Sequence, residues 1–192
     1  MLVEAAADTV KEKFMNSLEQ RLKAIIRDVP DFPKKGIMFK DITPILSNAE
    51  VMRDITNFLS VIYRNQEIDA VIGIESRGFI FGPIMAQALG VPFVPVRKSG
   101  KLPYSTVSQS YDLEYGVDQL EIHTDAIKEG DKVLIHDDLL ATGGTAEAAS
   151  KLVNKLGGVI AGYTFLIELQ FLNGRENIQK YTEGNVYSIV KY

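Results

Sequence analysis

The stretch VLIHDDLLATGGTAEAA, residues 133–149, decides the fold of this 192-residue chain. It begins with the apolar run Val133–Ile135, which is typical of a buried strand. Two aspartates follow, and two adjacent glycines then stand before an alanine-rich run with helical spacing. The order of strand, glycine-rich turn and helix predicts one β–α unit of an α/β protein.

Similar apolar runs recur along the rest of the chain. They lie at 69–75, 92–97, 132–138, 159–169 and 186–190, and helical patterns lie at 49–64, 81–89 and 145–156. This alternation predicts a mainly parallel five-stranded sheet flanked by helices. Such sheets bind ligands at the carboxyl ends of the strands, near the point where the strand order reverses.

The segments outside this alternation have their own patterns. Residues 17–27 predict an amphipathic helix, and residues 1–16 a loosely held helix or arm. Residues 28–47 contain three prolines and predict an irregular hood segment with a short strand at 37–39. Residues 102–120 are polar and too long for an ordinary connection, so we expect a flexible lid loop. The length favours one domain over residues 1–192.

Composition excludes several classes of function. The chain has no cysteine and two histidines, which excludes thiolate chemistry and a histidine-rich metal site. Its net charge of −4 argues against general nucleic-acid binding, although ten acids and two lysines gather in residues 111–147. The N-terminus lacks the basic region of a secretory signal, and glycines and prolines interrupt the uncharged residues 78–96. We therefore expect a cytoplasmic protein without a membrane span.

The turn after the 132–138 strand has the chemistry of a sugar-phosphate site. Adjacent glycines let backbone N–H groups converge, and the following helix N-terminus favours an anion. The turn consists of Ala141, Thr142, Gly143, Gly144 and Thr145. The preceding carboxylates, Asp137 and Asp138, would repel a phosphate but suit a ribose diol. A ribose 5-phosphate would suit both the carboxylate pair and the glycine-rich turn. The alternative is a plain β–α turn with a solvated acid pair.

This stretch resembles the phosphoribosyl pyrophosphate (PRPP) motif of type I phosphoribosyltransferases. Further segments are similar, in the same order, to those of the adenine phosphoribosyltransferase family, and the similarity covers residues 17–192. These segments are DFPKKGIMFKDITPIL (31–46), GIESRGFIFG (73–82), VRKSGKLP (96–103) and SYDLEYG (110–116). The resemblance implies a glycosyltransferase of purine salvage that converts adenine and PRPP to AMP and pyrophosphate.

The resemblance also implies a pyrophosphate site. Glu75, Ser76 and Arg77 correspond to the family's pyrophosphate loop, in which the peptide between the first two residues is typically cis. Many relatives have aspartate at the position of Glu75. Arg97, Lys98 and Lys101 follow the next strand and predict a cationic rim, with a solvated charge run as the alternative.

For the base, the resemblance implies residues from three segments. Phe39 would stack on adenine, with Met38 and Lys40 beside it and Leu169 on the other side. Glu114 is the candidate acid or base near the purine N7, next to Tyr115, and Arg77 is the second candidate catalytic residue. Phe39 as a core residue and Glu114 as a solvated carboxylate are the alternatives. His136 is expected to be a packed neutral imidazole and His123 to be exposed.

The family further implies Mg²⁺ bound mainly through the substrate diphosphate, no metal site built by the protein, and a homodimer. Two other functions stay open at this point. One is transfer to another base such as xanthine, which a base-panel assay would reveal. The other is a transcriptional regulator that senses PRPP, although such proteins carry an added winged-helix domain or a basic face.

Overall fold

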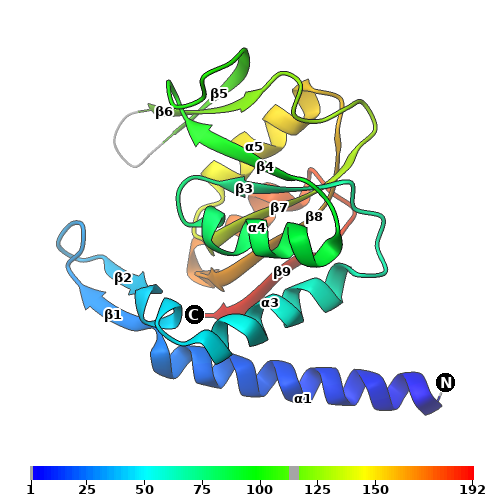
Figure 1. The fold of residues 1–192 in the computed structure, drawn as a ribbon. Helices are drawn as coiled ribbons and strands as arrows, with labels where there is room; N and C mark the ends of the chain where they lie inside the picture. Colours follow the sequence, from blue (N-terminus) through cyan, green and yellow to red (C-terminus); the bar gives the residue numbers. More distant parts are fainter. Residues whose placement is uncertain (1, 113–116) are drawn as a thin grey trace. The chain divides into compact units, whose positions relative to one another are not determined.

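The computed structural model describes residues 2–112 and 117–192, with side chains from residue 13 onward except that of Asp112. Figure 1 shows the elements in chain order. The chain forms two compact units, residues 1–58 and 59–192. None of the described helices is both long and apolar enough to cross a membrane.

The first unit consists mainly of helices. It contains α1 (Leu2–Ile25), α2 (Thr43–Leu46) and the start of α3 (Ala49–Tyr63), with the antiparallel pair β1 (Arg27–Pro30) and β2 (Met38–Asp41). Leu18 and Leu22, on the predicted apolar face of α1, are buried, while Arg21 forms an ion pair with Asp54 at 2.7 Å. The predicted helix therefore extends through the expected arm, and the hood segment is a two-stranded hairpin.

The second unit contains a seven-stranded sheet in the order β5-β6-β4-β3-β7-β8-β9. Five of its strands, β4-β3-β7-β8-β9, pair in parallel and are the five predicted from the apolar runs. Their bounds are β3 (Ala70–Ile74), β4 (Phe93–Lys98), β7 (Lys132–Leu140), β8 (Val159–Glu168) and β9 (Val186–Lys191). The strand order reverses between β3 and β7, because β4 follows on one side and β8 on the other.

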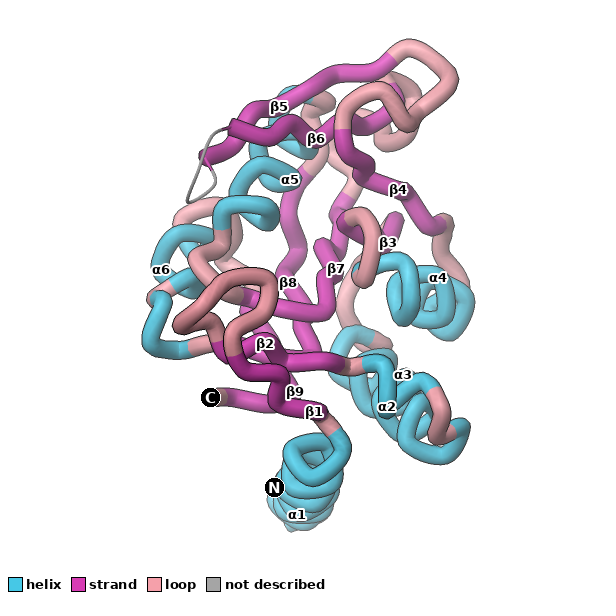
Figure 2. The backbone as a smooth tube through the Cα atoms, turned by 90° about the vertical axis from the view of Figure 1, so that its left-hand side faces the viewer, coloured by secondary structure: helices cyan, strands magenta, loops and turns pink. Residues whose placement is uncertain are grey.

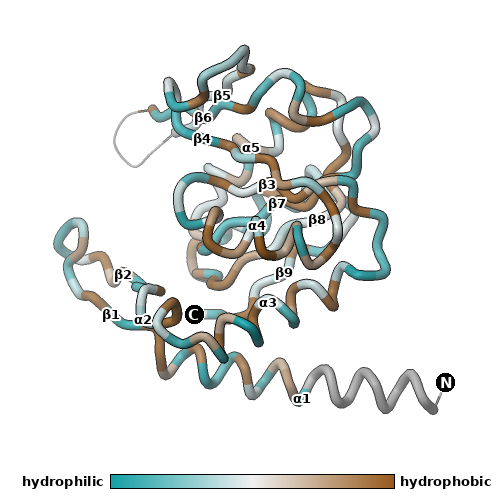
Figure 3. The backbone as a smooth tube through the Cα atoms, viewed as in Figure 1, coloured by the Kyte–Doolittle hydropathy of each residue, from teal (hydrophilic) through white to brown (hydrophobic). Residues whose placement is uncertain are grey.

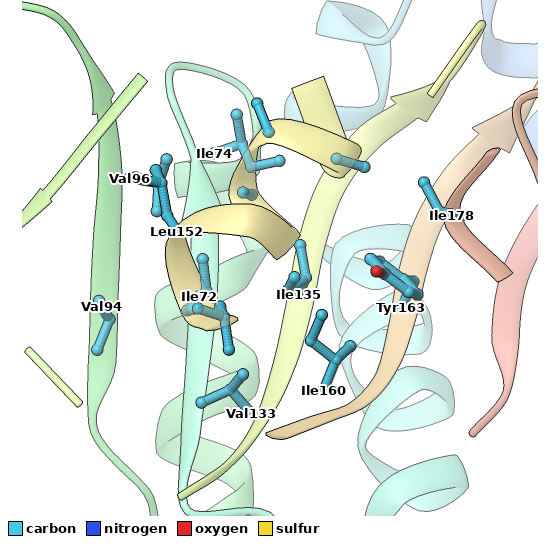
Figure 4. Packing of buried hydrophobic residues seen from close by; sticks show 14 of the residues in the cluster. Ile72, Ile74, Val94, Val96, Val133, Ile135, Leu152, Ile160, Tyr163 and Ile178 are labelled. Atoms are coloured by element: carbon cyan, nitrogen blue, oxygen red, sulfur yellow. The ribbon is translucent and has the colours of Figure 1, made fainter. Parts of the chain in front are cut away.

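Helices cover both faces of this sheet. Figure 2 shows α4 (Gly78–Leu89) on one side of β3 and β7, and α5 (Gly144–Lys155) with α6 (Gly174–Gln179) on the other. Between β8 and α6 lies a short 3₁₀ turn, η1 (Gln170–Leu172). Side chains such as Ile72, Ile135 and Leu152 pack between the sheet and α5 (Figure 4). Figure 3 shows that α4 and the central strands are largely hydrophobic, as the apolar runs predict.

The predicted lid loop is wrong in its secondary structure. The segment contains β5 (Thr106–Asp112) and most of β6 (Val117–His123), which form an antiparallel pair at the sheet edge. β6 lies between β5 and β4 and has the alternating pattern of a strand with one buried face, on which Leu120 and Ile122 lie. β5 is polar because only one of its faces meets protein, so its strand depends on pairing with β6.

The two histidines differ in burial. His136 on β7 is fully buried, and its Nδ1 lies 3.1 Å from the carbonyl oxygen of Thr164, so Nδ1 carries the proton. Burial lowers the pKa of His136 to about 4, which confirms the packed neutral imidazole. The expectation that His123 is exposed is wrong: it is half-buried, with its ring edge-on to Tyr104 at 6.2 Å.

We expect His136 to make folding sensitive to acid. Below pH 6.5 the unfolded imidazole takes up a proton, whereas the folded one does so only near pH 4. The contribution of neutral His136 to the free energy of unfolding is therefore fully present above pH 6.5. Below that pH it falls by about 1.4 kcal/mol per pH unit, or roughly 3 kcal/mol by pH 4. Urea unfolding between pH 4.5 and 7.5 should show this slope to be lost in His136→Asn or His136→Gln. Asp137 and Asp138 titrate in the parental protein and in the variants, so the difference between their pH profiles reports His136 alone. The same pH dependence of the free energy of unfolding in the parental protein and the variants would contradict this role of His136.

Candidate active site

A cavity of about 360 Å³ lies at the carboxyl ends of β3 and β7 in the second unit. This is the point of strand-order reversal at which the sequence predicts a ligand site. The walls come from the β3–α4 turn, β4, β5 and the β7–α5 turn. The lining residues are Glu75, Arg77, Lys98, Tyr111 and residues 137–146.

The β7–α5 turn has the form of an anion site. β7 ends at Leu140, and α5 begins at Gly144 with Gly143 as its N-cap at φ 84°. Among the described residues no side chain caps this helix, so the N–H groups of its first turn remain available as donors. A Cβ at Gly143 would lie 2.7 Å from the carbonyl oxygen of Gly174, which is too close for any other residue.

The two aspartates share one wall of the cavity. Asp138 is 2% exposed, and its Oδ2 lies 3.0 Å from Nε of Arg77. Asp137 accepts a hydrogen bond at 2.9 Å from the backbone N–H of Asp138. Burial raises the pKa of both carboxyls; the charge of Asp138 raises that of Asp137 further, while Arg77 opposes the shift at Asp138. Arg77 favours the ionised form of these carboxyls, in which their oxygens can accept hydrogen bonds from hydroxyl groups.

The predicted cations gather around acidic side chains. Glu75 accepts a hydrogen bond at 2.5 Å from Nζ of Lys101 and one at 3.3 Å from Arg97, as well as one at 3.0 Å from the backbone N–H of Lys98. Burial alone would raise the pKa of Glu75, but these bonds outweigh it and lower the pKa. Nζ of Lys98 pairs with Asp118 on β6 at 2.9 Å. The carboxylate of Glu75 thus holds cations in place, a role that the sequence did not reveal.

The β3–α4 turn has the expected backbone. The peptide bond between Glu75 and Ser76 is cis, as the resemblance implies. The carbonyl oxygen of Ser76 accepts a hydrogen bond from Phe79 at 3.2 Å at the start of α4. That helix begins at Gly78, three residues before its predicted start, where a Cβ would lie 2.8 Å from the carbonyl oxygen of His136. The glycine lets the turn approach β7 closely, which brings Arg77 to Asp138.

The predicted base-binding residues come from both compact units of the chain. Met38, Phe39 and Lys40 belong to β2 of the first unit, where the Phe39 ring meets Phe32 edge-on at 5.0 Å. Leu169 lies just after β8 in the second unit and donates its N–H to the carbonyl oxygen of Leu140 at 2.9 Å, at the start of the β7–α5 turn. Glu114 and Tyr115 lie outside the described residues.

Three residues of this region escaped the sequence analysis. Tyr111 lines the cavity and donates a hydrogen bond to Asp118 at 3.1 Å, and burial together with that carboxylate raises the pKa of Tyr111 to about 12. Asn177 on α6 donates a hydrogen bond at 2.8 Å to the carbonyl oxygen of Thr142. Tyr111 falls within the SYDLEYG segment, which could have indicated it, whereas Asp118 and Asn177 follow no local pattern.

Comparison with known proteins places this geometry in a family. Residues 41–180 match the family model for the phosphoribosyl transferase domain. The adenine phosphoribosyltransferase of Flavobacterium johnsoniae is 56% identical over 161 residues, which are 84% of this chain and 95% of that protein. That of Nitrosococcus oceani is 54% identical over 173 residues, covering 90% of this chain and 99% of its own.

Solved structures agree with the sequence comparison. The crystal structure of adenine phosphoribosyltransferase from Thermoanaerobacter pseudethanolicus is similar with a TM-score of 0.85 and 49% identity, over 90% of this chain and 99% of that one. The Saccharomyces cerevisiae enzyme, in complex with an imino-altritol bisphosphate and adenine, has a TM-score of 0.83 and 42% identity. This similarity covers 91% of this chain and 99% of the yeast chain. The chain belongs to the adenine phosphoribosyltransferase family.

Proposed function

We propose that the cavity of about 360 Å³ at the carboxyl ends of β3 and β7 is where this chain converts adenine and PRPP to AMP and pyrophosphate, the reaction of its family. One observation carries the proposal. A pair of carboxylates, a glycine turn at a helix N-terminus and two cations, Arg77 and Lys98, line a single cavity of the second unit. These three features match the three parts of PRPP: the ribose diol, the 5-phosphate and the pyrophosphate.

Asp137 and Asp138 would accept hydrogen bonds from the 2- and 3-hydroxyls of the ribose. The five residues of the turn, from Ala141 to Thr145, would bind the 5-phosphate through backbone N–H groups and the two threonine hydroxyls. The diol and the phosphate would fix the two ends of the sugar and hold its C1 at a set position. Positioning of this kind supplies much of the rate in reactions that need little covalent participation from the protein.

The pyrophosphate would lie on the cationic side of the cavity. Arg77 and Lys98 line the cavity there, and Arg97 and Lys101 are bound to Glu75, which also lines it. All four cations would contribute positive charge, and the backbone of Glu75 and Ser76 would form the adjoining turn. As adenine N9 attacks C1 of the ribose, the bond from C1 to the pyrophosphate oxygen breaks and its electron pair leaves with pyrophosphate. The cations stabilise the negative charge that develops on the leaving group.

The adenine contacts and the acid–base step remain proposals from the family. Phe39 would stack on the purine, and the backbone of Met38 would hydrogen-bond its Watson–Crick edge, with Lys40 alongside and Leu169 on the opposite side. Glu114 would accept the proton that N7 loses as N9 forms its bond to C1, and Arg77 would act beside it. Strands β5 and β6, whose connection contains Glu114, would form the lid that excludes water from the activated sugar.

Mg²⁺ suits this donor set. Among the described residues no group of three or more histidines, cysteines or acids could hold a metal ion, whereas carboxylate oxygens line the cavity. We propose that Mg²⁺ is carried mainly by the diphosphate and ribose oxygens of PRPP, near Asp137 and Asp138. When bound, it would neutralise charge on the diphosphate. We also propose a single functional domain, a homodimer and a cytoplasmic location.

A base-panel assay tests the proposed function. The purified protein is given PRPP with adenine, hypoxanthine, guanine or xanthine, with and without Mg²⁺, and nucleotide and pyrophosphate are quantified. We expect product from adenine at least about 10⁴-fold more efficiently than from hypoxanthine, because a backbone acceptor facing the 6-amino group would meet a carbonyl in hypoxanthine. Chelation of Mg²⁺ should abolish turnover. Comparable use of hypoxanthine or xanthine would assign a different base.

A further inference from the structure

We propose that Asn177 is a positioning residue that holds the phosphate-binding turn in its working conformation. The proposal rests on the proposed function, because it assigns a support to the turn that would bind the 5-phosphate. Its starting point is the hydrogen bond at 2.8 Å from Nδ2 of Asn177 to the carbonyl oxygen of Thr142. The two residues are 35 positions apart, and each lines a second cavity of about 250 Å³, which Gly144 of the turn also lines.

The bond acts on the peptide unit that most needs a constraint. The carbonyl of Thr142 and the N–H of Gly143 belong to one planar peptide group and point in opposite directions. Gly143 has φ 84°, and glycine tolerates the conformations on both sides of a peptide flip. A flip would exchange the positions of this C=O and N–H and change the donors that the turn presents. The amide of Asn177 anchors the oxygen and so selects one of the two orientations.

Asn177 is itself held at the correct place. Arg175, two residues earlier, donates to Glu168 at 2.9 Å through Nε and to the carbonyl oxygen of Val186 at 2.6 Å. Glu168 is 4% exposed, so this anchor lies in the interior at the end of β8. Helix α6 also packs against α5 (Figure 2).

The glycine that begins α6 makes the approach possible. A Cβ at Gly174 would lie 2.1 Å from the carbonyl oxygen of Ala141 and 2.9 Å from the backbone nitrogen of Gly143. Just after the C-terminal end of α6, the hydroxyl of Tyr181 donates a hydrogen bond at 3.0 Å to Glu147 in the first turn of α5. The segment from Gly174 to Tyr181 therefore supports the turn and the helix that follows it, and Asn177 is its contact with the flexible peptide.

Gln179 provides a matched control on the same helix. Its side-chain amide donates to the carbonyl oxygens of Thr182 and Gly184, at 3.2 and 3.3 Å. These hydrogen bonds join the C-terminal end of α6 to the residues that follow it and do not involve the β7–α5 turn. Loss of the Gln179 amide should disturb α6 about as much as loss of the Asn177 amide does, without releasing the Thr142 carbonyl.

The test compares steady-state kinetics of Asn177→Ala, Asn177→Asp and Gln179→Ala. We expect Asn177→Ala to raise KM for PRPP roughly five- to tenfold, in proportion to one hydrogen bond, with kcat, KM for adenine and the unfolding midpoint nearly unchanged. Asn177→Asp should raise KM for PRPP further, because it replaces the donor by a carboxylate at nearly constant volume. Gln179→Ala should keep the parental KM for PRPP.

A second readout separates this proposal from the proposed function. AMP carries the 5-phosphate and adenosine does not, so Asn177→Ala should weaken AMP binding in calorimetry and leave adenosine binding unchanged. Equal loss for both ligands, or a parental KM for PRPP in Asn177→Ala, would overturn the role of Asn177 while the parental enzyme remains active. If the parental protein forms no AMP and binds none, the proposed function itself fails.

Discussion

Replacement of Gly143 by alanine is expected to lower kcat/KM for PRPP by about 10²- to 10³-fold, the size of effect seen when one donor or about 1 Å of positioning is lost. The residue has φ 84°, which disfavours a side chain, and a Cβ would lie 2.7 Å from the carbonyl oxygen of Gly174. The neighbour is backbone at the start of α6 and cannot rotate away. The turn must therefore change shape, and its N–H groups lose their common target.

Gly130→Ala is the control for backbone strain. Gly130 has the same φ of 84°, and within the described residues nothing lies within 4 Å of a Cβ built there. Both variants lose similar free energy of unfolding from the unfavourable φ, but only Gly143→Ala distorts the phosphate turn. The measurements are kcat/KM for PRPP and the midpoint of urea unfolding. Equal activity of the two variants would mean that the turn does not bind the phosphate.

Replacement of Arg77 by methionine is expected to affect both activity and stability. We expect kcat/KM to fall about 10³-fold, because under the proposed function Arg77 is a cation facing the leaving pyrophosphate. The free energy of unfolding should also fall by about 3 kcal/mol, because the carboxylate of Asp138, at 2% exposure, loses the guanidinium 3.0 Å away. The pKa of Asp138, which burial already raises, should rise further without the opposing charge of Arg77.

The double variant Arg77→Met with Asp138→Asn separates the two effects. It removes the unpaired carboxylate, so most of the lost stability should return while activity stays low. Urea unfolding and kcat/KM of the parental protein, both single variants and the double variant form a complete cycle. Stability that is no better in the double variant than in Arg77→Met alone would show that the ion pair does not support the fold.

Much of the architecture follows from local patterns. The five parallel strands are largely apolar runs, as expected for a sheet with helices on both faces. Helices α3 and α5 repeat their apolar residues with helical spacing, whereas α4 is apolar over most of its length. The Asp137–Asp138 pair and the glycine turn also lie within one β–α unit. A short segment therefore contains both groups, and this explains why the sequence could predict that they line the same cavity.

The β5–β6 pair and the pairing of charges could not be predicted in the same way. β5 has few apolar residues, and its strand depends on the register that pairs Thr106 with His123 and Val107 with Ile122. The side chain of Glu75 meets Arg97 and Lys101 because β3 and β4 run in parallel and end at the same edge. The spacing of charged residues along the chain does not predict which acidic side chain pairs with which cation.

The sequence by itself determined the class of fold, the family and the edge of the sheet at which the cavity lies, and it predicted the residue types proposed to bind a ribose phosphate. Each of these depends on runs of residues within about 20 positions. Only the tertiary structure decided that Arg77 pairs with Asp138, that Glu75 gathers cations and that Asn177 holds the carbonyl of Thr142. Those contacts join residues 22 to 61 positions apart, and chain folding brings them together through strand order and close glycine contacts.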